Sequence, residues 1–253
     1  GVSIGNNIRD IQTRAKDIKS FVDNTGFSAS SISNVLNGAG KKVGECLDIL
    51  LLNTDKLNIL MNDTNLSSSN ISSMLGNSGK ELEKAIKGLV SGKNKIIDIT
   101  KRGIFSPQNI AVMLKDSGKN IKEGISDFAA RQEKLEKYIG TSQFNAVNVS
   151  AMIGGAGRNI GIAIDSFLKR GRVLQEFMIS SGFEAENISS ILAGAGSSIG
   201  ITIDELIANK SKLEQLITSN KTPRSVSYKL SKSSSQLTKN ITTMLVSRQA
   251  QAS

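Results

Sequence analysis

Residues 105–119 read FSPQNIAVMLKDSGK, and variants of this stretch return every 39 residues, five times in the 253-residue chain. Each copy opens on a large apolar residue and reaches a glycine that does not vary. The openers are Phe27, Leu66, Phe105, Phe144 and Phe183, and the glycines are Gly40, Gly79, Gly118, Gly157 and Gly196. A fixed period of this length predicts a solenoid. With the helix signals described below, we expect an all-α, right-handed superhelical solenoid of helical-hairpin repeats.

The repeat register divides the whole chain, which we interpret as a single array over residues 1–253. Full repeats are expected at 27–65, 66–104, 105–143, 144–182 and 183–220. Residues 1–26 match the back of a unit, and residues 221–253 match its front as a degenerate C-terminal repeat or cap. We therefore expect the sequence to be a fragment of a longer array.

Each unit is expected to begin with a short helix. Ser106 and Thr222 precede apolar-periodic runs, and a hydroxyl there suits a helix N-cap. We expect this helix to run to about two residues before the invariant glycine, which ends it in a left-handed or tight turn.

A second helix follows the glycine, because Ile199, Ile203 and Leu206 share one helical face in the fifth unit. One long bent helix and two short ones both fit the polar interval that comes next. We favour a break near Lys210, whose counterpart one repeat earlier is Gly171, and this break adds a short third helix to each unit.

Cations recur at the turn between the helices. The residue after the invariant glycine is Lys41, Lys80, Lys119 or Arg158 in four successive units, with Lys42 adding a charge in the first. A glycine permits close backbone approach, and the N–H groups at a helix start attract anions. Together with a formal net charge of +10, this pattern favours phosphate contacts. The alternative is a solvated basic row, because tandem duplication copies any residue.

Other recurrent polar residues have structural interpretations. Asn70, Asn109, Asn148 and Asn187 are expected to form a hydrogen-bond ladder between repeats, and Met74, Met113 and Met152 to lie in the core. Asp48, Asp165 and Asp204 are expected at a solvated or interhelical ion-pair position.

The front of each unit resembles the repeats of TAL-effector-like (TALE-like) DNA-binding proteins. Phe105-Ser106-Pro107 matches their opening, and Asp116-Ser117-Gly118-Lys119 matches their two variable residues, glycine and basic residue. The resemblance covers about the first twenty residues of each unit. The rest is longer than the family's usual unit and lacks its later proline.

The resemblance implies double-stranded DNA as the partner, with loops in the major groove. The implied base-facing residues are Ala39, Ser78, Ser117, Ala156 and Ala195. The implied backbone contacts are Gly40, Lys41, Lys42, Gly79, Lys80, Gly118, Lys119, Gly157, Arg158 and Gly196. Because Ala and Ser make no bidentate base contact, we expect weak or degenerate sequence preference.

Two other interpretations stay open. Gly26-Phe27-Ser28 resembles the repeat start of the mitochondrial transcription termination factor family, which would keep nucleic acid as the partner. A protein-interaction solenoid, such as a bacterial effector or scaffold, is the other.

Composition argues against an enzyme. The chain has no His and a single Cys46, so the usual general base and the common metal sites are missing, and we expect no catalytic residue, metal or cofactor. We expect a monomer in a reducing compartment, either the bacterial cytoplasm or, for a secreted effector, the host nucleus. No apolar run is long enough to predict a membrane span.

Overall fold

The computed structural model describes residues 2–217, 222–231 and 236–252, and this part of the chain forms helices and turns without a strand. The predicted all-α class is confirmed. Two compact units divide the chain, Gly1–Ala130 and Arg131–Ser253, and their boundary falls inside helix α10 (Ile121–Thr141). The repeat boundary expected between residues 220 and 221 lies outside the described residues.

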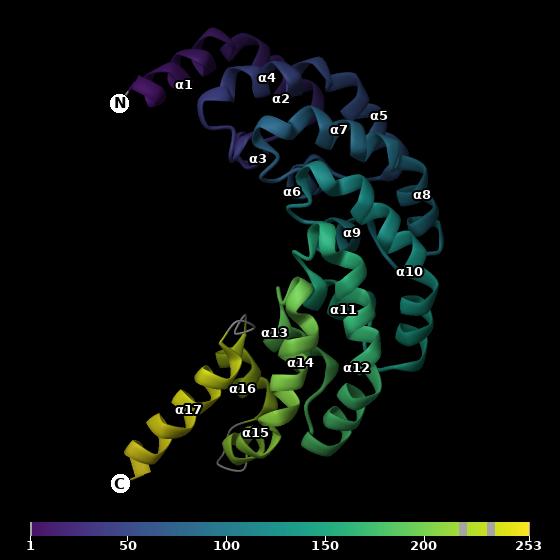
Figure 1. Cartoon of the computed structure of the whole chain (residues 1–253), viewed down its shortest axis with the longest axis vertical. Coiled ribbons are helices and arrows are strands. Elements are labelled where there is room, and N and C mark those ends of the chain that lie inside the picture. Colours follow the sequence, from purple (N-terminus) through teal and green to yellow (C-terminus); the bar gives the residue numbers. More distant parts are fainter. Residues whose placement is uncertain (1, 218–221, 232–235, 253) are drawn as a thin grey trace. The chain divides into compact units, whose positions relative to one another are not determined.

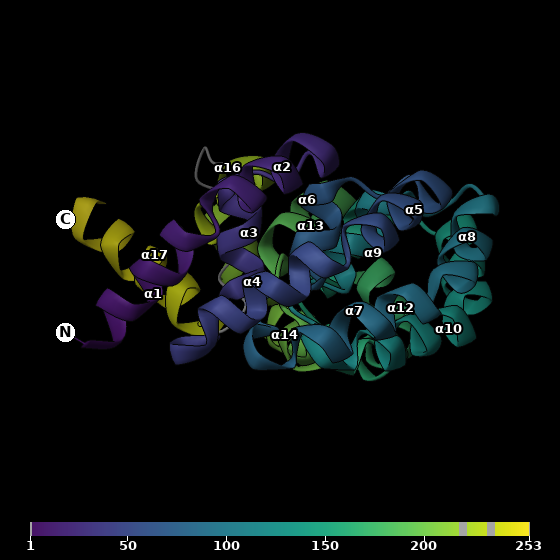
Figure 2. The same cartoon turned by 90° about the horizontal axis from the view of Figure 1, so that it is seen from above.

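Unit 1 repeats one order of elements: a short front helix, a 3₁₀ turn, and back helices (Figure 1). The front helices are α3 (Ala29–Leu36), α6 (Ser68–Met74) and α9 (Pro107–Met113), and the turns are Gly40–Lys42, Gly79–Glu81 and Gly118–Asn120. The back helices are α1 (Val2–Thr13), α2 (Ala15–Thr25), α4 (Val43–Leu52), α5 (Thr54–Thr64), α7 (Leu82–Ser91), α8 (Lys93–Lys101) and the start of α10. Front helices pack on front helices and back helices on back helices, as α4 does beside α7 (Figure 2).

Unit 2 continues the same order after the end of α10. Its front helices are α11 (Ala146–Ile153), α13 (Ala185–Leu192) and α16 (Pro223–Leu230), and its 3₁₀ turns are Gly157–Asn159 and Gly196–Ser198. The other helices are α12 (Ile160–Ser181), α14 (Ile199–Ala208), α15 (Lys210–Ile217) and α17 (Leu237–Ala252). The layers again segregate, since α13 packs between α11 and α16 while α14 packs on α12 and α17.

The openers and the paired apolar residues form the core. Phe27, Leu66 and Phe105 in unit 1, and Phe144 and Phe183 in unit 2, are at most 2% exposed. The three methionines expected in the core, Met74, Met113 and Met152, are fully buried. Because each front helix is only seven or eight residues long, burial of these side chains, not helix propensity, holds it in place.

The front helices start where the hydroxyl pattern predicts. The Ser67 and Ser106 side chains accept from the backbone N–H of Asn70 and Asn109, and each Asn returns a bond to complete a capping box. In unit 2, Asn145 and Glu184 begin the same boxes with Asn148 and Asn187. The recurrent Asn therefore caps its own helix, a role that the sequence interpretation missed.

The predicted ladder of Asn side chains is seen at Asn70, Asn148 and Asn187. Asn70 donates to Gln108 Oε1 in unit 1, Asn148 donates to Ser189 Oγ at 3.2 Å, and Asn187 donates to Ser227 Oγ at 3.4 Å. Each acceptor belongs to the following front helix. One amide thus fixes both the start of a helix and its register against the next.

The front helices end earlier than predicted, four or five residues before the invariant glycine instead of two. The residue two before that glycine is itself left-handed in every copy, with φ of +84° at Gly38, +58° at Asn77 and Asp116, +77° at Gly155 and +74° at Gly194. The invariant glycine is also left-handed, as predicted, with φ between +45° at Gly79 and +59° at Gly40. Two left-handed residues in one connection end the helix sooner than one would.

The break in the back helices occurs in some repeats and not in others. It lies at Arg14, Asn53, Gly92 and Asn209, one residue before the predicted position. The side-chain amides of Asn53 and Asn209 donate to the carbonyl four residues earlier. The break predicted at Gly171 is wrong, because α12 runs through it unbroken. The contact with the Tyr138 ring accounts for a glycine at position 171, because a Cβ there would lie 2.4 Å from the ring.

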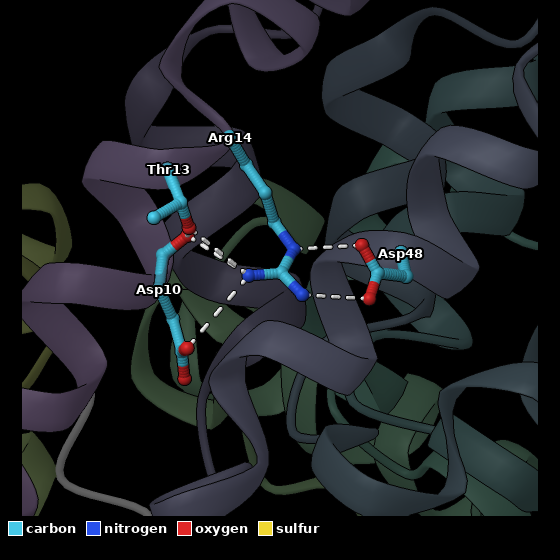
Figure 3. A network of polar contacts seen from close by, with 4 residues as sticks. All are labelled: Asp10, Thr13, Arg14 and Asp48. Atoms are coloured by element: carbon cyan, nitrogen blue, oxygen red, sulfur yellow. Dashed lines mark hydrogen bonds and ion pairs between the residues drawn. The ribbon is translucent and has the colours of Figure 1, made fainter.

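The Asp set forms ion pairs between successive back helices, one of the two roles expected for it. Arg14 donates to both carboxylate oxygens of Asp48 at 2.7 and 2.8 Å, with Asp10 and Thr13 contacting the same guanidinium (Figure 3). In unit 2, Arg131 pairs with Asp165 at 2.9 Å and Arg170 pairs with Asp204 at 2.6 Å. Each pair joins residues 34 apart, so it links one repeat to the next.

Candidate nucleic-acid interface

The candidate interface in unit 1 is a row of exposed cations, Lys41, Lys42, Lys80 and Lys119, which we call the basic ridge. All four belong to the 3₁₀ turns that precede the back helices. In unit 2 the equivalent turn exposes Arg158, and the turn after it carries Ser197.

Close packing of successive turns fixes the backbone positions of the basic ridge in unit 1. The first two turns are in contact, and a Cβ on Gly79 would lie 2.6 Å from the carbonyl carbon of Gly38. The N–H groups of Asn77 and Asp116 donate to the carbonyls of Asn34 and Ser73 in the preceding front helix, at 3.4 and 2.9 Å. The cations therefore stand on a fixed backbone rather than on independent loops.

The same contacts recur in unit 2. The two turns touch, a Cβ on Gly196 would meet the backbone of Gly155 and Ala156 at 3.3 Å, and Gly194 N–H donates to Ala151 O at 2.9 Å. The invariance of the glycine thus has a structural cause, a left-handed φ in all five copies, to which Gly79 and Gly196 add the close approach of the preceding turn.

This packing changes the role expected for most of the glycines. Gly79, Gly118, Gly157 and Gly196 are buried, and only Gly40 among the five is exposed. A phosphate cannot lie against a backbone that the neighbouring turn already covers. Backbone contact is left to Gly40 and to the side chains of the ridge.

The five residues expected to face bases are buried as well. Ala39, Ser78, Ser117, Ala156 and Ala195 are 4–8% exposed. The Ser78 and Ser117 hydroxyls donate to the carbonyls of Leu75 and Leu114, three residues earlier. The left-handed residue before each of them turns the chain so that the next side chain points inward. In this conformation none of the five can read a base edge.

The side chains exposed beside them are Asn77 and Asp116, which occupy the left-handed position. Asn77 Oδ1 accepts from Asn37 Nδ2 at 2.6 Å, and the Asp116 carboxylate lies over Gly76, where a Cβ would collide with it. Asn, Asp and Gly are the residues that tolerate this backbone conformation, and this signal in the sequence identifies the position.

Carboxylates partly offset the charge of the ridge. Lys42 lies 2.9 Å from Glu45, whose hydrogen bond raises the pKa of Lys42, and Lys119 lies 3.8 Å from Glu81. A cleft of about 300 Å³ between the turns is lined by Lys80, Lys119, Glu81 and Asp116, and two charges of each sign make it a poor anion pocket. Lys41, Lys80 and Arg158 form no ion pair within the described part of the chain.

A cleft of about 810 Å³ lies between α1 and α3 and reaches Gly38 and Gly40 of the first turn. Ile11, Ile32, Leu36 and small polar residues line it, and none of its lining side chains is titratable. Over the described residues, no group of three or more Cys, Asp or Glu is placed to hold a metal ion.

No family model matches the chain, and no curated protein or solved structure matches it either. No single described helix could cross a membrane; only Ala185–Leu192 with Gly196–Ala208, a pair bent by 120°, reaches the length and composition together.

Proposed function

We propose that the chain is a modular, TALE-like DNA-binding array, a right-handed superhelical solenoid of 39-residue repeats that contacts the phosphates of duplex DNA. The observation that carries the proposal is the exposure of a cation at the same place in four successive turns, Lys41, Lys80, Lys119 and Arg158. A charge that recurs every 39 residues in a repeat array suits a partner whose charge also repeats, and duplex DNA is such a partner.

Binding through the backbone sets the expected specificity. Phosphate contacts position a protein on DNA without reading sequence. Because Ala39, Ser78, Ser117, Ala156 and Ala195 are buried, base reading would need a change in the turns. The proposed activity is therefore duplex binding with weak or degenerate sequence preference.

Removing the four cations tests the proposal. In K41Q/K80Q/K119Q/R158Q, we expect affinity for a random 30-base-pair duplex to fall about tenfold or more, and the salt slope to flatten by about 3–4, near 0.9 per lost contact. The matched control is K16Q/K134Q/K137Q/K212Q, which removes the same charge from exposed positions on back helices. Equal losses of affinity in the two variants would show that the four cations contribute only through the net charge of the chain. That result would contradict the proposal.

A protein-interaction solenoid is the second candidate, and the burial of all five expected base readers favours it. For such a protein, duplex affinity would be that of any chain with net charge +10. The variant K41Q/K80Q/K119Q/R158Q, which we call the ridge variant, would then bind like the matched control.

A further inference from the structure

The charge of the chain is concentrated at its C-terminal end. Glu214 is the last carboxylate residue, and six cations follow it: Lys221, Arg224, Lys229, Lys232, Lys239 and Arg248. Residues 215–253 therefore carry six of the ten net positive charges on 39 of 253 residues. No acidic side chain of this segment can offset them. Of the six, the structure describes the side chains of Arg224, Lys229 and Lys239.

These three cations lie on exposed faces of packed helices. On α16, Val226 and Leu230 are buried, Arg224 and Tyr228 are exposed on the opposite side, and Lys229 is exposed beside the buried face. Arg224 and Tyr228 are one turn apart, so their side chains are neighbours on the surface. Lys239 is exposed on α17, which packs on α16 (Figure 1).

These three cations also differ from several arginines in the back helices, which form ion pairs with carboxylates. Arg14, Arg131 and Arg170 are held by aspartates, but none of Arg224, Lys229 and Lys239 forms an ion pair within the described residues. Tyr228 is 80% exposed, whereas Tyr138, the only other tyrosine, is partly buried. A phenol beside unpaired cations adds a hydrogen-bond donor that can reach a phosphate oxygen.

We propose that the exposed side chains of Arg224, Tyr228 and Lys229 on α16 and of Lys239 on α17, two helices whose described residues include no carboxylate, form a second, sequence-independent contact for the phosphate backbone of duplex DNA. The inference rests on the proposed function for the identity of the partner, but its residues are separate from the basic ridge. An anionic membrane fits less well, because a helix that lies on a membrane needs an exposed apolar face and that of α16 holds Arg, Tyr, Ser and Lys.

The test uses the full chain and a random 30-base-pair duplex over a salt series. In R224Q/K229Q/K239Q, we expect the slope of log affinity against log salt to flatten by about 2.7, near 0.9 for each of three lost contacts. The control R224K/K229R/K239R keeps the charges and should keep the slope. Far-ultraviolet circular dichroism of both variants checks that the helices are retained.

Tyrosine fluorescence gives an independent readout, because the chain has two Tyr and no Trp. Duplex DNA should change the emission of the native chain, and Y228F should abolish most of that change.

The outcomes separate the two proposals. A C-terminal variant that binds like the native chain, beside a ridge variant that does not, overturns this inference and leaves the proposed function standing. The reverse result supports this inference and contradicts the proposal that the cations of the turns contact DNA. Tighter binding of the native chain to anionic phosphatidylserine vesicles than to duplex, or no duplex binding at all, overturns it too.

Discussion

Arg170 on α12 donates two hydrogen bonds to Asp204 on α14, from Nε to Oδ1 at 2.8 Å and from Nη2 to Oδ2 at 2.6 Å. The guanidinium and the carboxylate face each other as parallel forks, a geometry that favours Arg over Lys. In unit 1, Arg14, which immediately precedes α2, forms the same two hydrogen bonds with Asp48 on α4. Such a pair fixes the register of one back helix against the next.

We predict a measurable coupling between Arg170 and Asp204. Both side chains are partly exposed, so a double-mutant cycle with R170Q and D204N should give about 0.5–1 kcal/mol in the free energy of unfolding, the upper part of the range for surface pairs. The matched control is Arg172 with Glu176, an i,i+4 pair on the exposed face of α12, for which we expect about 0.3 kcal/mol. Urea unfolding measures both cycles. Equal coupling in the two would show that the inter-repeat pair has no special weight.

The pairs also predict a dependence of stability on pH. Hydrogen bonds from Arg14 and Arg170 lower the pKa values of Asp48 and Asp204 below that of a free aspartate. A lowered folded-state pKa stabilises the fold above the unfolded-state pKa, about 3.9, and this contribution is lost as pH falls through the folded value. The gap in urea midpoint between the native chain and D48N/D204N should therefore be constant above about pH 5 and close as pH falls further. A gap that widened in acid would contradict the assignment.

Two glycines at the same repeat position should respond differently to alanine. Gly40 and Gly79 are both left-handed, but a Cβ on Gly40 meets nothing within 4 Å, whereas one on Gly79 meets Gly38 and Ala39 backbone atoms at 2.6–2.8 Å. G40A should lower the free energy of unfolding by about 1–2 kcal/mol because of the left-handed backbone conformation alone. G79A should cost about 1–3 kcal/mol more, because the packed turns must separate. Similar losses in the two variants would show that the turns do not pack as described.

Cys46 reports on the same contact. Its thiol is buried and donates to Gly79 O at 3.2 Å, and burial raises the pKa of the thiol. We expect its reaction with a disulfide reagent at pH 8 to be slower in the folded chain than in urea by about 100-fold or more, set by local opening. G79A should speed the reaction in the folded chain and G40A should change it less. A native thiol that reacts as fast as the unfolded one would contradict the burial.

Features that depend on near neighbours in the chain could be predicted from the sequence. The caps at Ser67 and Ser106 need only residues three positions apart, and the left-handed glycines need only their own backbone. The partner of Asp48 could not be found in this way. Arg14 lies 34 residues earlier, and the two meet only because successive back helices stack in one register.

Two errors have different physical origins, one in long-range packing and one in local backbone conformation. Gly171 lies inside the unbroken helix α12, where the Tyr138 ring of the preceding back helix leaves no room for a Cβ, and the sequence near Gly171 does not show this contact. Ser78 and Ser117 were expected at the surface, but two left-handed residues in each connection turn them inward. The cations needed no such contact, since Lys80, Lys119 and Arg158 are exposed as expected.

The most direct test of the central claim is the affinity of the full chain for a random 30-base-pair duplex, measured from about 50 to 300 mM salt beside single-stranded DNA and RNA of equal length. We predict a preference for the duplex and a log–log slope of about −4 or steeper, as four or more phosphate contacts require. Equal binding to every polyanion, or no duplex binding at physiological salt, would contradict a repeat array built for DNA.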